Sequence, residues 1–126
     1  DQEGGRVARM KPPVWPAYPA GEAFDRLYDR APASAIEAVR ANAEALGLDL
    51  AEAGITADCY PSLDVRQPGA HDVIGDRAFG AEPMRVAALG RAALAATRNC
   101  RPSTRARRTW KPTLPPSAPC PMPPSA

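Results

Sequence analysis

Hydrophobic residues recur at helical spacing in two stretches of this chain. The first series has intervals of three or four residues, which puts its members on one face of a helix. It comprises Ile36, Val39, Ala43, Leu46 and Leu50. Before it, Ser34 and Glu37 match an S-x-x-E capping box, and after it Gly54 suits a C-terminal stop. We therefore predict a helix over residues 35–53.

The second series follows Pro83, a residue that suits the first turn of a helix. Its apolar members are Met84, Val86, Leu89, Ala93 and Leu94. This pattern predicts a second amphipathic helix over residues 82–97. A shorter helix is predicted near residues 22–28.

The segment between the two long helices has a different pattern. Residues 55–60 favour a short strand that Pro61 closes, and L-D-V follows at 63–65. Cys59 lies within that strand and is predicted to pack in the core. Residues 66–80 are predicted to be a loop, as are the Gly- and Pro-containing residues 1–19. Strands that alternate with helices indicate an α/β fold with parallel strands.

Charge and proline are distributed unevenly along the 126 residues. The last 26 residues hold eight of the 16 prolines and five of the 16 basic side chains, but none of the 14 acids. We predict that residues 98–126 form a disordered basic tail, attached to a mildly acidic body. The overall charge of +2 therefore does not predict a nucleic-acid partner.

Other compositional features exclude further classes. No apolar run is long enough to span a membrane. The three cysteines form no C-x-x-C pair, which argues against a disulfide framework or zinc site and favours a reducing cytoplasm. His71 is the single histidine, and one histidine does not make a metal site. We expect no metal and no cofactor.

Two clusters could carry chemistry. In D-Q-E-G-G-R-V-A-R, acids and arginines surround a Gly-Gly pair, so the segment could bind a polar ligand or form a charged surface turn. In I-G-D-R-A-F-G, Asp76 and Arg77 stand between glycines, either as a buttressed loop or as a ligand site. Asp64 follows the predicted strand, where an α/β barrel places site residues, although it could equally cap a turn.

These motifs, taken together with their spacing, resemble a known family. D-Q-E-G-G-R-V-A-R, then L-D-V, then I-G-D-R-A-F-G-x-x-P is similar to glycoside hydrolase family 3, in its bacterial β-N-acetylhexosaminidase branch of peptidoglycan recycling. The resemblance covers roughly residues 1–96. It implies that residues 1–97 are part of a (β/α)8 barrel from a cytoplasmic enzyme. Such an enzyme removes terminal, non-reducing β-linked N-acetylglucosamine by a retaining mechanism.

The resemblance also implies roles for individual residues. Asp1, Arg9 and Arg77 match sugar-binding positions of the family, whereas Asp64 and Asp76 match supporting positions. Glu3 belongs to the motif without an expected sugar contact, as does Arg6. The implied partner is a saccharide that contains N-acetylglucosamine, with no nucleic acid and no membrane.

The chain also departs from the family pattern. The strand and helix expected before Asp1 are missing, as are the K-H-F-P-G-H-G block, the D-S-H loop with its acid/base histidine, and the aspartate nucleophile. Tyr60 and Ser62 replace the small and apolar residues of A-P-V-L-D, which indicates local repacking. We therefore expect no catalytic residue, no hydrolysis by this chain alone, and poor folding or aggregation.

The tail leaves two further hypotheses open. Its composition suits GC-rich DNA translated out of frame, or else a genuine basic linker. In the second case the chain could be a non-catalytic binding module, with the P-x-x-P of residues 112–115 beside Lys111 meeting an acidic partner or a proline-reading domain.

Overall fold

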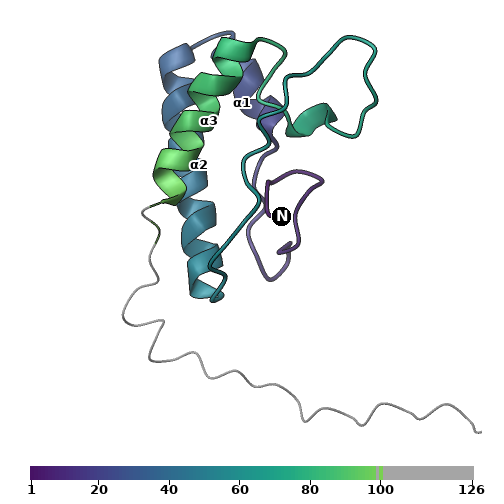
Figure 1. The fold of residues 1–126 in the computed structure, drawn as a ribbon. Helices are drawn as coiled ribbons and strands as arrows, with labels where there is room; N and C mark the ends of the chain where they lie inside the picture. Colours follow the sequence, from purple (N-terminus) through teal and green to yellow (C-terminus); the bar gives the residue numbers. More distant parts are fainter. Residues whose placement is uncertain (99, 101–126) are drawn as a thin grey trace, which may run out of the picture.

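The computed structural model describes residues 1–98 and 100, and this part of the chain contains three α-helices and one short 3₁₀ helix (Figure 1). In chain order they are α1 (Gly21–Tyr28), α2 (Pro32–Glu52), the 3₁₀ helix η1 (Gly75–Arg77) and α3 (Pro83–Thr97). The two helices predicted from the apolar spacing, and the shorter helix predicted near residues 22–28, are confirmed. The predicted tail lies outside the described residues except for Arg98, which caps α3, and Cys100.

The start of α2 differs from the prediction. The helix begins at Pro32, whose ring fixes φ at a helical value, and its N-cap residue Ala31 makes no side-chain hydrogen bond. Ser34 therefore lies inside the first turn, and the predicted capping box is wrong. The predicted stop is confirmed, because Gly54 has a φ of 79° and the following Ile55 N donates to Leu50 O at 2.9 Å.

A side-chain cap is instead present on α3. Glu82 is its N-cap, and the carboxylate accepts from Met84 N at 2.9 Å and from Arg85 N at 2.6 Å. Two of the backbone N–H groups that a helix leaves without partners are thereby satisfied.

The predicted strand is not present. Residues 55–60 and 63–65 are extended without a ladder, and the one backbone bridge within residues 1–98 joins Gly4 to Val7. A strand needs hydrogen bonds to a neighbouring backbone, whereas here Gln2 N donates to the side chain of Asp58, at 2.9 Å. In the described part, the helices are therefore joined by extended segments that form no sheet. Cys59, predicted to be buried, is exposed.

The path of the chain nevertheless follows a helix–return–helix order. Helices α2 and α3 lie side by side and run in the same direction, and the extended segment returns from the end of α2 toward the start of α3 (Figure 1). Small residues on the facing sides let the two helices approach closely. Those that are buried are Ala35, Ala43, Ala92 and Ala93.

The core lies where the three helices meet the segment just before α3. Phe24 of α1 meets Phe79 edge to face, with ring centroids 6.2 Å apart. Val39 and Leu89 are fully buried in the same cluster, and Leu46 is fully buried further along α2, as their helical spacing predicted.

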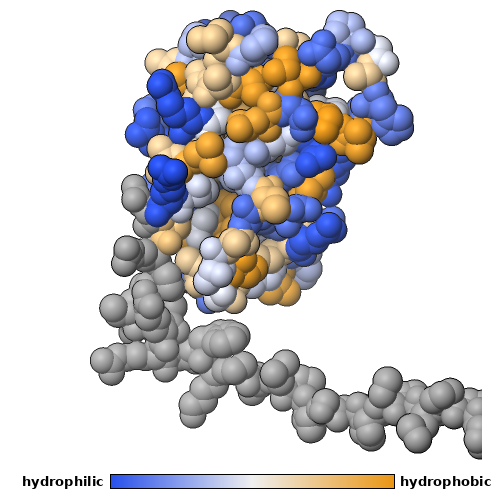
Figure 2. Space-filling view, viewed as in Figure 1, coloured by the Kyte–Doolittle hydropathy of each residue, from blue (hydrophilic) through white to orange (hydrophobic). Residues whose placement is uncertain are grey.

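Two residues that we predicted on the buried face of α3 are exposed instead. Met84 is 74% exposed and Leu94 is 41% exposed. The true face is narrower, because Val86, Leu89 and Ala93 already fill the contact with α2. Hydrophobic and hydrophilic residues intermingle on the face shown in Figure 2.

An ionic cluster fastens α1 to α3. The guanidinium of Arg85 bonds to Asp25 and lies 2.8 Å from Asp29, with its centre 5.0 Å from the ring centroid of Tyr28. Asp25 also accepts from Arg66, at 3.1 Å. Among the described helices, none is long and apolar enough to cross a membrane.

Candidate functional site

The N-terminal motif forms a tight turn. Glu3 N donates to Val7 O at 2.8 Å, and Gly4 and Gly5 have φ values of 90° and 55°, which only glycine adopts readily. A Cβ on Gly4 would collide with the carbonyl oxygen of Pro19. The turn therefore packs directly on the W-P-A-Y-P loop, and both glycines are required by its shape.

A buried carboxylate fixes Arg77. Glu3 is 7% exposed, and its two carboxylate oxygens accept from Nε and Nη2 of Arg77, at 2.9 and 2.7 Å. This bidentate contact joins residues 74 positions apart. The hydrogen bond to Glu3 raises the pKa of Arg77 above its usual value, and the charges of Glu3, Asp64 and Asp76 add to that effect. Arg77 therefore stays a cation.

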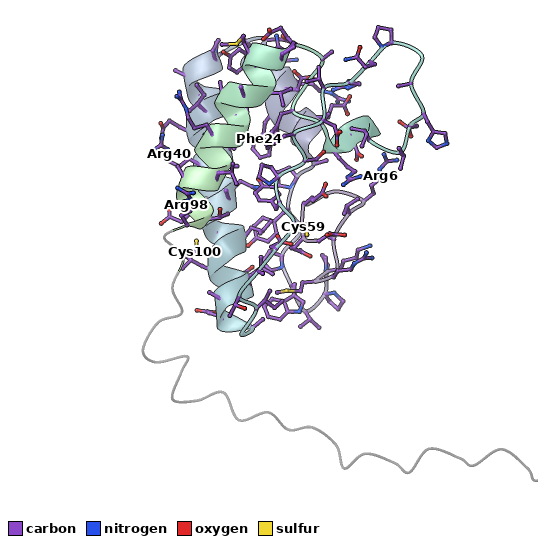
Figure 3. The ribbon with its side chains drawn as sticks, viewed as in Figure 1. Arg6, Phe24, Arg40, Cys59, Arg98 and Cys100 are labelled. Atoms are coloured by element: carbon purple, nitrogen blue, oxygen red, sulfur yellow. The ribbon has the colours of Figure 1, made fainter. Side chains whose placement is uncertain are left out.

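A second charge pair joins the same turn and loop, with the positive group now on the turn. Arg6 Nε lies 2.8 Å from Asp76 Oδ1, and its Nη1 donates to Asp72 at 3.2 Å. Figure 3 shows Arg6 beside the η1 segment. The N-terminal turn thus supplies the carboxylate of Glu3 to Arg77, and the guanidinium of Arg6 to Asp76. These two charge pairs hold the loop of residues 72–77 against the turn.

Asp1 and Arg9 face solvent at the open side of the turn. Their side chains are 43% and 77% exposed, and Arg9 Nη2 lies 3.9 Å from Asp1 Oδ2. A pair this exposed and this long stabilises the fold little, so either group can exchange its partner for a ligand.

The predicted supporting acids lie around Arg77. Ser62 Oγ donates to Asp64 at 3.0 Å, and both Asp64 and Asp76 act electrostatically on Arg77. Asp64 also lines a hollow of about 280 Å³ under the loop of residues 65–75. A hollow of about 530 Å³ between the C-terminal ends of α2 and α3 contains none of the predicted site residues. The charged groups, rather than that hollow, define the candidate site.

The structure joins some of the predicted residues and separates others. Asp1 contacts Arg9, and Asp76 contacts Arg6, but no salt bridge within the described chain links Arg77 to Asp1. His71 accepts a hydrogen bond from Val73 N at 3.0 Å and so serves its own turn. No group of three potential metal ligands occurs among residues 1–98 and 100.

Sequence reasoning missed two residues next to the site. Gln2 is 3% exposed; its Oε1 accepts from Arg9 N at 2.7 Å and from Met10 N at 3.0 Å, and its Nε2 donates to Met10 O at 2.9 Å. Asp58 accepts from the backbone of Gln2. Gln2 bonds to backbone across its own turn, and Asp58 bonds to backbone 56 residues away, and neither contact leaves a periodic signal in the sequence.

Comparison with known families gives one match over most of the chain. The model described as "Glycosyl hydrolase family 3 N terminal domain" matches residues 1–107. All the candidate site residues lie within that range.

Individual relatives agree with this match. A β-hexosaminidase of Bordetella avium is 37% identical over 92 residues, which are 73% of this chain and 26% of the relative. The β-hexosaminidase LpqI of Mycobacterium tuberculosis is 34% identical over 88 residues, which are 70% of this chain and 21% of that relative. The chain thus spans about a quarter of the length of these glycoside hydrolases.

Solved structures give the same result. The crystal structure of native NagZ from Neisseria gonorrhoeae matches with a TM-score of 0.73 and 30% identity, over 78% of this chain and 29% of NagZ. The same enzyme crystallised with N-trifluoroacetyl-D-glucosamine matches equally well. The described residues therefore have the fold of one part of that structure.

Proposed function

Because the chain belongs to glycosyl hydrolase family 3, we propose that residues 1–97 are the sugar-binding part of a β-N-acetylhexosaminidase barrel. The proposed ligand is a terminal, non-reducing β-linked N-acetylglucosamine, as found in peptidoglycan fragments. The support is that relatives covering most of this chain are β-hexosaminidases, and that a matching structure was solved with an N-acylglucosamine. A retaining mechanism in the cytoplasm belongs to the same proposal.

The observation that carries this proposal is the contrast between inner and outer charges at the N-terminal turn. Glu3 is buried and paired, whereas Asp1 and Arg9 are exposed and only loosely paired. An exposed carboxylate accepts hydrogen bonds from sugar hydroxyls, and guanidinium groups donate to hydroxyl and amide oxygens. Arg77 uses Nε and Nη2 on Glu3, and its Nη1 donors have no protein hydrogen bond in the described part of the chain.

We propose further that the 126-residue chain binds the sugar without cleaving it. Its one histidine, His71, precedes α3, whereas the acid/base histidine implied by the family resemblance follows that helix. We therefore expect no cleavage of the glycosidic bond, because the proton donor and the nucleophile that the family resemblance implies are not among these 126 residues.

Titration of the chain with N-acetyl-D-glucosamine, followed by NMR chemical shifts, tests the sugar site. The expected result is shifts confined to residues 1–10 and 72–80, and weaker binding by Arg9→Gln. Arg40→Gln is the matched control, because Arg40 is 53% exposed with a carboxylate 3.8 Å away, and it lies on the other side of the molecule in Figure 3. Equal affinity in both variants would argue against the assignment of Arg9.

A hydrolysis assay tests the second part of the proposal. The chain is incubated with a chromogenic β-N-acetylglucosaminide, and the expected result is no release of chromophore above buffer. Turnover that follows the purified chain, and that Asp1→Asn reduces, would show that catalytic groups are present after all.

A further inference from the structure

Two buried residues next to Asp1 form a layer beneath the exposed charges. Gln2 is 3% exposed and Glu3 is 7% exposed, and they are the two polar or charged residues buried within the described chain. Burying such groups is costly unless they are fully hydrogen-bonded. Each of them is hydrogen-bonded to a different arginine-bearing segment.

Gln2 organises the segment that carries Arg9. Its side-chain amide makes three hydrogen bonds, two from backbone N–H groups at Arg9 and Met10 and one to the Met10 carbonyl. These bonds close the turn across seven or eight residues and fix the backbone from which the Arg9 side chain extends. Gln2 N is itself held by Asp58, at 2.9 Å.

Glu3 organises the guanidinium of Arg77. Both carboxylate oxygens are used, so the plane of the guanidinium is fixed as well as its position. Asp76 cannot take over this role, because it is paired with Arg6 at 2.8 Å.

We propose that Gln2 and Glu3 are positioning residues for the sugar site, with Gln2 setting the backbone of Arg9 and Glu3 setting the guanidinium of Arg77. This inference rests on the proposed function, since it assumes that the two arginines contact the sugar. In this arrangement three consecutive residues serve one site. Asp1 meets the ligand, and the two residues after it orient the arginines that also meet it.

The expected effect follows from preorganisation. A long side chain that is immobilised before binding does not lose that freedom when the ligand arrives, a saving of about 0.5–1.5 kcal/mol per side chain. Releasing the guanidinium of Arg77, or the backbone at Arg9, is therefore expected to weaken the affinity for N-acetyl-D-glucosamine by about 2- to 13-fold.

The test compares Glu3→Gln and Gln2→Ala with Asp25→Asn, in the full 126-residue chain. Asp25 is the matched control, because it is a largely buried acid that likewise holds arginines, Arg66 and Arg85, but it ties α1 to α3. Sugar affinity is measured by NMR titration, and folding by circular dichroism. We expect weaker sugar binding in the first two variants and unchanged binding in the folded fraction of the third.

A spectroscopic readout separates positioning from general stability. The Nε–H resonance of Arg77 is expected to shift and to exchange faster with water in Glu3→Gln, since a carboxamide accepts with one oxygen rather than two. Glu3→Asp keeps the charge but is one methylene shorter, so its sugar affinity is expected to be lower than that of the unaltered chain. This variant also decides the question if Glu3→Gln does not fold.

The outcomes distinguish the two proposals. Absence of sugar binding by the unaltered chain would refute the proposed function and this inference with it. Binding by the unaltered chain, together with full affinity in Glu3→Asp and Gln2→Ala, would refute the positioning roles alone.

Discussion

Tyr60 offers a direct test of how the extended segment packs against α2. Its hydroxyl is buried, and neither Tyr60 Oη nor the nearby Asn42 Nδ2 has a hydrogen-bond partner among the residues that the structure describes. Burial raises the pKa of Tyr60 from 10.0 to about 12, and the charges of Asp58 and Glu3 contribute, although the Asn42 amide acts in the other direction. The Tyr60→Phe variant removes this hydroxyl and leaves the ring.

The raised pKa makes the free energy of unfolding depend on pH. Between about pH 10 and pH 12 the folded chain keeps the phenol proton that the unfolded chain loses, so this free energy falls as the pH rises. The slope approaches about 1.4 kcal/mol per pH unit, which amounts to about 2 kcal/mol at pH 12. Below pH 10 both states are protonated and Tyr60 contributes no slope.

Urea denaturation followed by circular dichroism, from pH 7 to pH 12, measures this contribution. Tyr60→Phe is expected to lose the alkaline slope that Tyr60 causes. At pH 7 it is expected to be more stable than the unaltered chain by about 1 kcal/mol, because an unsatisfied buried hydroxyl is removed. Tyr28→Phe serves as a control for the removal of a phenol elsewhere. Parallel curves for the unaltered chain and Tyr60→Phe above pH 10 would refute the reasoning.

Three further substitutions test the core and the helix ends by the same denaturation assay. Phe79→Ala is expected to lower the free energy of unfolding by about 3–5 kcal/mol, whereas Val14→Ala, at 79% exposure, is expected to change it little; similar values for the two would argue against the core. Glu82→Ala is expected to cost about 1 kcal/mol through the lost cap of α3, and an unchanged midpoint would contradict that role. Ser34→Ala is expected to cause no loss, since α2 has no side-chain cap; a loss of about 1 kcal/mol would restore the capping box.

The helices could be predicted because their signal is local. Val39 and Leu46 in α2, and Val86 and Leu89 in α3, are buried at the positions that their spacing indicates. A helix satisfies its own backbone, so its period depends little on what packs against it. The exact start of α2 was harder to predict, since Pro32 and the S-x-x-E pattern gave competing signals two residues apart.

The strand could not be predicted in the same way, because the hydrogen bonds of a strand come from other segments. Residues 55–60 have a composition that suits a strand, and their path between α2 and α3 is extended. Without a neighbouring backbone in register, that composition produces no ladder, and Cys59 is exposed. The pattern along the chain predicted the order of helix, extended segment and helix, but not this missing pairing.

The candidate site, too, could be predicted only in part. The residue types of Asp1, Arg9 and Arg77, with the family resemblance, predicted a polar site. The same sequence was also consistent with a charged surface turn. The burial of Gln2 and Glu3 favours our proposal of a ligand site. A solvated turn does not require buried polar side chains, whereas a binding site is more precise when buried, hydrogen-bonded residues support the groups that meet the ligand. Because the bond from Glu3 to Arg77 spans 74 residues, that layer becomes visible only when the chain is folded.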